Sequence, residues 1–299
     1  MTNPDRLSAH LRQVKSAHHG VMDHPITPSS PDRALRRRAT HEESVRAGRS
    51  WWDSEAELYY QEHGADLGDA ELTWGPEGWT ERELGLLGDL RGRDVLEVGA
   101  GAAQGGRWCA AQGARVVSTD LSSGMLRVAQ RIDEGHAGPA PVAYAQCDGA
   151  RLPFADACVD LVVTAHGVLA FVPDADAVLR EWARVVRPGG RVVFSLPHPF
   201  RWVFPDVPGP DGLVARYPYA TDEAYVEETE DGAATYTEHH RTVGDLVRAV
   251  HGAGLVLVDL VEPGWPPGLA REWGGWGPVR GRVVPGTAIL VAHRPSTPR

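Results

Sequence analysis

Two glycines and a carboxylate are spaced as in sites that bind an adenosine-containing cofactor. The segment 94–101 joins a short apolar run to Gly99 and Gly101, which is typical of a buried strand that ends in a tight turn. Asp120 ends the next apolar run, close to where a carboxylate grips ribose hydroxyls in a βαβ unit. The pattern predicts such a cofactor at the carboxyl edge of a parallel sheet.

The same segment distinguishes between classes of cofactor. A nicotinamide dinucleotide favours a third small residue after the two glycines, but Gln104 stands at that position. Glu97 precedes the turn, and its carboxylate suits a cationic ligand such as an ammonium or a sulfonium better than an anionic one. Taken alone, the segment is also compatible with a glycine turn in another kind of α/β protein.

Further motifs follow in a fixed order, at 146–154, 159–169, 181–190 and 191–195. Together with the glycine turn they resemble the class I S-adenosylmethionine-dependent methyltransferases, close to the small-molecule group that includes the quinone-biosynthesis enzymes. The resemblance covers residues 76–196. Ala103 departs from it, since many relatives carry a third glycine there, and we expect only a slightly altered loop.

The resemblance implies S-adenosylmethionine as cofactor and an α/β fold. The expected fold is a Rossmann-like doubly wound sheet, mostly parallel with one antiparallel strand near the C-terminus, and with helices on both faces. A helical cover before the core and a lid insertion at about 197–240 complete it. We expect a mobile extension over 1–39 and a single domain over 40–299.

The resemblance also implies roles for individual residues. Asp120 would hold the ribose, although it could instead cap the helix expected at 122–133. Leu121 and Met125 would flank the adenine, and Asp148 would accept its amino group unless it only forms a turn. The full predicted cofactor set is Glu97, Gly99, Ala100, Gly101, Gln104, Asp120, Leu121, Met125, Asp148, Gly149, Ala150 and His166.

Methyl transfer mainly requires that the acceptor be aligned with the methyl group and that water be excluded. An oxygen or nitrogen acceptor can also need a general base, and His166, His198 and His240 are candidates, with His239 beside them. Each is equally compatible with a structural role. Aromatic residues in the helix at 45–62 and in the lid at 200–236 predict an apolar or aromatic acceptor. No metal-ligand pattern is visible.

Composition restricts the partners. The formal net charge is −10, yet residues 1–50 hold nine basic against five acidic side chains. The acidic remainder disfavours nucleic acid, and no apolar run is long enough to cross a membrane. Three cysteines without metal or disulfide spacing predict a cytoplasmic protein. Two alternatives stay open: a non-catalytic S-adenosylmethionine-binding protein, and an RNA methyltransferase that uses the basic N-terminal segment.

The periodicity predicts the order of the elements. Thr40 is expected to cap a helix, with Glu43 at the capping-box position, and a second helix is expected over 77–90. An Asp231–Gly232 turn predicts a hairpin over 224–240. Strands are expected near 93–98, 115–120, 142–147, 159–165, 190–196, 255–262 and 286–293, and further helices near 104–113, 122–133, 174–187 and 242–253.

Overall fold

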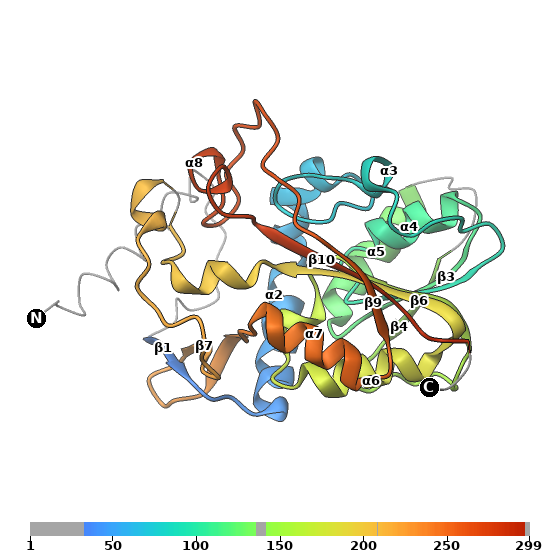
Figure 1. The fold of residues 1–299 in the computed structure, drawn as a ribbon, viewed down its shortest axis with the longest axis horizontal. Coiled ribbons are helices and arrows are strands. Elements are labelled where there is room, and N and C mark those ends of the chain that lie inside the picture. The colour runs from blue at the N-terminus through green and yellow to red at the C-terminus, as the bar shows by residue number, and fades with distance from the viewer. Residues whose placement is uncertain (1–32, 136–141, 208, 297–299) are drawn as a thin grey trace, which may run out of the picture.

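A computed structural model describes residues 33–135, 142–207 and 209–296. Its centre is a seven-stranded sheet in the order β4-β3-β2-β5-β6-β10-β9, in which β10 runs antiparallel to both of its neighbours (Figure 1). This confirms the predicted fold class. The strands are β2 (Asp94–Val98), β3 (Arg115–Asp120), β4 (Ala143–Gln146), β5 (Val159–Thr164), β6 (Val186–Pro197), β9 (Val256–Val261) and β10 (Thr287–His293).

Alternate residues of the central strands face opposite layers, which is why these strands are apolar throughout. Leu96 and Val162 pack with α6 (Ala175–Val185) and α7 (Val243–Gly252). Val95 and Val163 pack on the other face with α4 (Gln104–Ala111). The helix α5 (Ser123–Gly135) contacts β3 and β4. The sheet is therefore covered on both faces, and its carboxyl edge is left for the loops.

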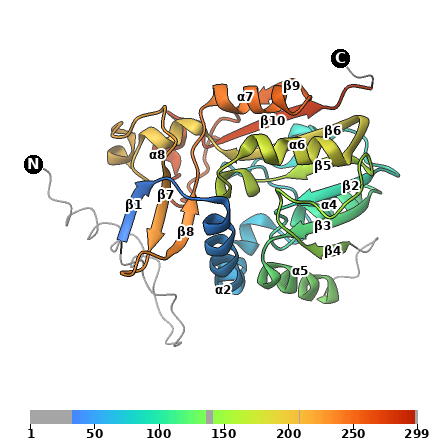
Figure 2. The same ribbon diagram turned by 90° about the horizontal axis from the view of Figure 1, so that it is seen from below.

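A long helix, α2 (His41–Leu67), lies across this edge between the main sheet and a smaller one (Figure 2). As predicted, it begins after Thr40, whose Oγ1 accepts a hydrogen bond from Glu43 N at 3.2 Å. The Glu43 carboxylate does not complete the capping box. It accepts hydrogen bonds from Arg37 instead, so it ties the start of α2 to the preceding chain.

The smaller sheet has three antiparallel strands, β1 (Arg33–Arg37), β7 (Ala224–Glu228) and β8 (Ala234–Glu238). The hairpin of β7 and β8 was predicted, but β1 was not, because it lies within the expected mobile extension. The strand is held by pairing with the edge of β7 and by Arg37 Nη2, which lies 2.6 Å from Glu43 Oε1 and 3.2 Å from Glu228 Oε2. Residues 1–32 lie outside the described residues.

Two local predictions were wrong. The helix expected over 77–90 is reduced to α3 (Glu81–Leu84), which begins after Thr80. The reason is that the Glu81 carboxylate is buried and accepts a hydrogen bond from Leu87 N at 2.7 Å, which bends the chain back. The hairpin turn is also longer than two residues. It spans 229–233, and Gly232 takes the left-handed conformation with φ of 84°.

The remaining short elements lie in the segments after β5, after β6 and between β9 and β10. They are 3-10 helices at Val168–Phe171, Pro199–Val203 and Pro210–Leu213, and the helix α8 (Pro278–Gly281).

Candidate functional site

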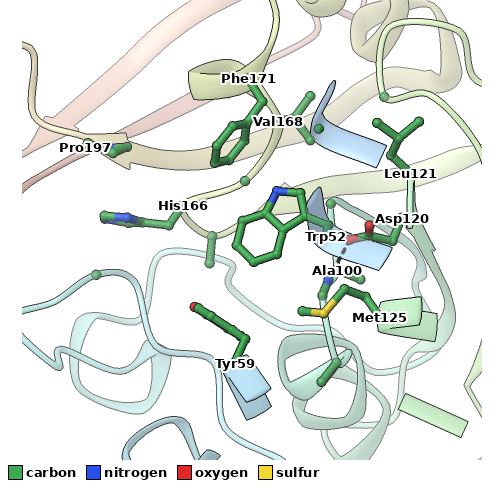
Figure 3. A pocket seen from close by; sticks show the side chains of 18 of the residues that line it. Trp52, Tyr59, Ala100, Asp120, Leu121, Met125, His166, Val168, Phe171 and Pro197 are labelled. Carbon is green, nitrogen blue, oxygen red and sulfur yellow. Dashed lines mark hydrogen bonds between the residues drawn. The ribbon is translucent and has the colours of Figure 1, made fainter. Parts of the chain in front are cut away.

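One cavity of about 380 Å³ opens at the carboxyl edge of the main sheet, under α2 (Figure 3). It brings together most of the residues that the sequence assigned to cofactor binding. Lining it are Glu97, Gly99, Ala100, Gly101, Gln104, Asp120, Leu121, Met125, Asp148, Gly149 and His166. Ala150 is not in the lining; its backbone N–H donates a hydrogen bond to Asp148 Oδ1 at 2.9 Å.

The glycine turn after β2 has the unusual backbone that its sequence predicts. Gly99 and Gly101 have φ of 66° and 55°, a region that disfavours side chains. A Cβ at Gly99 would lie only 2.7 Å from Val168 Cγ2, so the turn and the loop after β5 approach closely. Ala103 also has a positive φ, 56°, in the region that favours glycine.

Asp120 ends β3 with its carboxylate on the cavity wall. One oxygen accepts from Gly101 N at 2.8 Å and the other from Ser122 N at 2.8 Å. Burial raises its pKa to about 6, against the opposing effect of these amides. Asp120 thus joins two loops of the cavity, and its oxygens can accept further hydrogen bonds.

Polar groups at the start of α5 donate hydrogen bonds to a residue that sequence reasoning missed. Asp53 of α2 accepts hydrogen bonds from Gly124 N and Ser122 Oγ, each at 2.7 Å. No local signal reveals this contact, because Asp53 is far from α5 in the sequence. It fastens the covering helix to the main sheet layer directly beside Asp120.

Asp148 follows β4 and lines the same cavity. Besides Ala150 N, its carboxylate contacts His41, with 2.7 Å between Asp148 Oδ2 and His41 Nε2. The expected turn contact is therefore present, and the side chain still reaches the cavity wall. His41, the first residue of α2, was not among the predicted site residues.

The Glu97 side chain is buried between β3 and α4. Ser118 Oγ donates to Glu97 Oε2 at 2.6 Å, and a Cβ at Gly105 would come within 2.5 Å of Oε1. Burial raises the pKa of Glu97 to about 7. Its carboxylate thus occupies the space between β3 and the start of α4, where Gly105 and Gly106 leave room for it. Contact with a ligand stays a prediction for this residue.

Aromatic side chains form another part of the cavity lining, and two of them, Trp52 and Tyr59, also pack beside Met125. Trp52 is central, with ring centroids 5.3 Å from Tyr59 and 5.9 Å from Phe171, both in edge-to-face arrangements. Tyr236 contacts Trp51 at 5.2 Å. Further lining aromatics come from the C-terminal loop: Trp273 and Trp276. The side chains belong to α2, the loop after β5, β8 and residues 273–276, so only the fold brings them together.

A polar group adjoins these aromatic rings. Arg201 Nη1 donates to Glu238 Oε2 at 2.8 Å, and Arg201 Nη2 lies 3.7 Å from Asp206 Oδ2. All three side chains line the cavity. No local pattern predicts this group, because its members are spread along the predicted lid.

The candidate histidines separate clearly. His166 lines the cavity, whereas His198 and His240 do not. His198 is buried with Nε2 2.7 Å from Glu262 Oε1, and His240 Nε2 contacts Tyr219 O at 2.5 Å. Burial lowers the pKa of both. Neither of these two side chains lines the cavity, so a catalytic role for them stays a prediction. His239 also points elsewhere, with Nε2 2.9 Å from Ser44 Oγ.

Within the described ranges, no group of three or more His, Cys, Asp or Glu side chains is placed to hold a metal ion. Among the same residues, no helix has both the length and the apolar character needed to cross a membrane.

Comparison with known proteins agrees with this geometry. Residues 96–194 match a family model described as a methyltransferase domain. The chain is 32% identical over 270 residues to a demethylmenaquinone methyltransferase of Mycobacterium sp. (strain JLS), covering 88% of this chain and 99% of the relative. The chain belongs to the class I S-adenosylmethionine-dependent methyltransferases. This methyltransferase uses S-adenosylmethionine to methylate a small-molecule acceptor.

Solved structures show the same fold. An S-adenosylmethionine-dependent methyltransferase from Mesorhizobium loti has 25% identity and a TM-score of 0.55, covering 71% of this methyltransferase and 95% of that chain. A Burkholderia thailandensis 1,6-didemethyltoxoflavin-N1-methyltransferase has 20% identity and a TM-score of 0.52, covering 91% and 98% of the two chains.

Proposed function

We propose that the cavity holds S-adenosylmethionine at its acidic end, formed by Asp120 and Asp148, and a planar aromatic acceptor at its aromatic end, beside Trp52 and Arg201. The observation that carries this proposal is the continuity of one cavity from Asp120 and Asp148 to Trp52 and Arg201. Its volume of about 380 Å³ is within the range of sites for small molecules. The cofactor supplies an electrophilic methyl group, and the chain supplies binding, alignment and exclusion of water.

The acidic end fits an adenosine moiety. Asp120 offers two carboxylate oxygens, which are strong acceptors for paired hydroxyl groups. Leu121 and Met125 form apolar walls on the same side, and Asp148 offers an acceptor for an exocyclic amine. The positive φ values of Gly99 and Gly101 leave the backbone open to close approach by a ligand. We therefore retain the predicted roles of these residues as proposals.

The aromatic end favours an apolar, flat acceptor. Trp52, Tyr59 and Phe171 offer ring faces and edges, and ring contacts of this kind stabilise an aromatic ligand beyond its buried area. The mycobacterial relative is named for demethylmenaquinone, a quinone. We propose a quinol-type or related aromatic ring as the acceptor of this methyltransferase.

Nucleic acid is a poor candidate for the acceptor. The basic run at 36–38 is engaged within the chain: Arg36 lies 4.0 Å from the Tyr217 ring centre, Arg37 bridges Glu43 and Glu228, and Arg38 pairs with Asp222. These contacts oppose a role for the run as a free cationic surface for phosphates. A cytoplasmic location stays a prediction from the composition.

Calorimetry with S-adenosylhomocysteine tests the cofactor assignment. We expect Asp120→Ala to weaken binding by more than tenfold, since a charged acceptor of hydrogen bonds contributes roughly 1.5–3 kcal/mol. The matched control is Asp206→Ala at the other end of the cavity, which should bind like wild type. Wild-type protein that binds NAD and not S-adenosylhomocysteine would contradict the proposal, and so would equal affinity in a folded Asp120→Ala variant.

A further inference from the structure

Three side chains from distant parts of the chain form a hydrogen-bonded row beside the cavity. Thr287 Oγ1, at the start of β10, donates to Glu77 Oε2 at 2.6 Å. His166 Nε2, after β5, lies 3.1 Å from the same Oγ1. Glu77 and Thr287 are buried, whereas His166 lines the cavity. The row therefore connects an internal carboxylate to the site through one hydroxyl.

The single proton of the hydroxyl sets the direction of the row. Because Thr287 Oγ1 gives its proton to Glu77, it can only accept from His166 Nε2. The imidazole must then carry its proton on Nε2, which leaves the lone pair on Nδ1. Among the described residues, none donates a hydrogen bond to that Nδ1, and the ring is at the cavity wall (Figure 3).

The surroundings keep each member of the row in place. Gly286 N donates to Glu77 Oε1 at 2.7 Å, which fixes the second carboxylate oxygen. Ser195 Oγ accepts from His166 N at 2.9 Å and supports a backbone with φ of 57°. A Cβ at Gly75 would lie 1.9 Å from Thr287 Oγ1 and 2.9 Å from His166 Nε2, so only glycine fits against the row.

His166 is uncharged at neutral pH and so has a nitrogen lone pair that can accept a proton. Burial, with a smaller contribution from the nearby Arg201, lowers the pKa of His166 to about 4, so the ring is neutral at neutral pH. Burial raises the pKa of Glu77, although the hydrogen bonds from Thr287 and Gly286 oppose this. A neutral imidazole with a fixed tautomer can accept a proton without first losing one.

We propose that Glu77 and Thr287 are positioning residues that hold His166 with Nδ1 directed at the acceptor, and that His166 takes the proton which the acceptor releases on methylation. This rests on the proposed function. The methyl–sulfur bond breaks as the methyl–acceptor bond forms, the sulfur keeps the electron pair, and the proton passes from the acceptor to Nδ1. The acceptor class is thereby narrowed to aromatic rings that carry an ionisable hydroxyl or amine.

The tautomer of His166 is a direct test that needs no known acceptor. Long-range proton–nitrogen spectra of the full ¹⁵N-labelled chain with S-adenosylhomocysteine, assigned with His166→Gln, should show at least a tenfold excess of the Nε2–H form. Thr287→Val should reduce this excess below about threefold, and Thr287→Ser, which keeps the hydroxyl, should retain it. A wild-type ring protonated on Nδ1 would overturn the proposal.

The matched control is Thr237→Val, which removes a buried hydroxyl that has no hydrogen-bond partner among the described residues. It should leave the tautomer unchanged. Each threonine variant should bind S-adenosylhomocysteine within about twofold of wild type, which shows that it is folded. Absence of this binding in wild type would refute the proposed function. Normal binding with His166 protonated on Nδ1 would refute only the proposed roles of Glu77, Thr287 and His166.

Turnover gives a second readout. A panel of phenols, naphthalenediols, naphthylamines and naphthalenethiols should show methylation on hydroxyl or amine compounds. For these, His166→Gln should lower kcat by at least about 100-fold with little change in KM, as expected for a lost general base. An acceptor that wild type and His166→Gln methylate at equal rates would contradict the assignment.

Discussion

The acidic end of the cavity is built from residues that are close in sequence, whereas the aromatic end is assembled from segments far apart. Gly99, Asp120 and Asp148 each follow a strand of one parallel sheet, so their positions follow from the strand order. Trp52, Arg201 and Trp273 come from α2, the segment after β6 and the C-terminal loop. The first end depends on local backbone geometry, and the second depends on long-range packing.

The largest expected effect concerns the backbone of the acidic end. Gly99→Ala places a Cβ 2.7 Å from Val168 Cγ2 at a φ of 66°, so it should weaken S-adenosylhomocysteine binding by at least about 30-fold. Gly92→Ala is the control, since it has a φ of 69° but nothing within 4 Å of the new atom. Calorimetry that finds equal losses in both would show that backbone strain, and not the close approach of loops, decides binding.

The next effect concerns β1, which pairs with β7 in the smaller sheet. We propose that residues before 33 can be removed with little loss of stability. Removal through residue 38 also deletes Arg37 and leaves the buried Glu228 without this partner. This should cost about 2 kcal/mol, or roughly 4–8 °C in Tm. Thermal unfolding of the two truncated chains checks this, and equal Tm values would show that β1 adds nothing.

The pH dependence of cofactor binding should follow Asp120. Burial raises the pKa of this carboxyl to about 6, and only its ionised form has both oxygens free to accept. Affinity for S-adenosylhomocysteine should therefore be full at pH 7.5 and fall by up to about tenfold per unit as the pH drops below about 6. In Asp120→Asn, calorimetry across this range should show weaker and nearly constant affinity; a wild-type dependence in that variant would assign the titration to another group.

The smallest effect is expected at the aromatic end. Trp273 stacks on His63 with centroids 4.4 Å apart and lines the acceptor side of the cavity. Trp273→Ala should change S-adenosylhomocysteine affinity by less than about twofold while lowering methylation of any aromatic acceptor. Trp265→Ala, outside the cavity lining, is the control for loss of a loop tryptophan. A tenfold loss of cofactor affinity in Trp273→Ala would show that the aromatic end also contributes to cofactor binding.

The comparison also explains which predictions succeeded. The strands of the main sheet, the glycine turn and the positions of Asp120 and Asp148 were predicted because apolar runs and turn residues act over short distances. The helix over 77–90 failed because Glu81 and Glu77 use their carboxylates to bind distant or returning backbone amides, at Leu87 and Gly286. Such contacts leave no mark in the local periodicity.

The candidate histidines show the same limit. Residue type and position after a strand made His166 and His198 equivalent in the sequence. Packing directs His166 to the cavity through Thr287, and buries His198 with its Nε2 against the exposed Glu262 carboxylate. The backbone of His166 is left-handed, with φ of 57°, and is held by Ser195, which sequence reasoning could not foresee.

The sequence by itself determined the parallel core, the cofactor class and the edge of the sheet where the cavity lies, because hydrophobic periodicity and glycine conformations are local properties. Only the tertiary structure decided which aromatic rings line the cavity, that β1 completes the smaller sheet, and that Thr287 links Glu77 to His166. These features depend on side chains separated by long stretches of chain, which meet only when the sheet and its covering helix have packed.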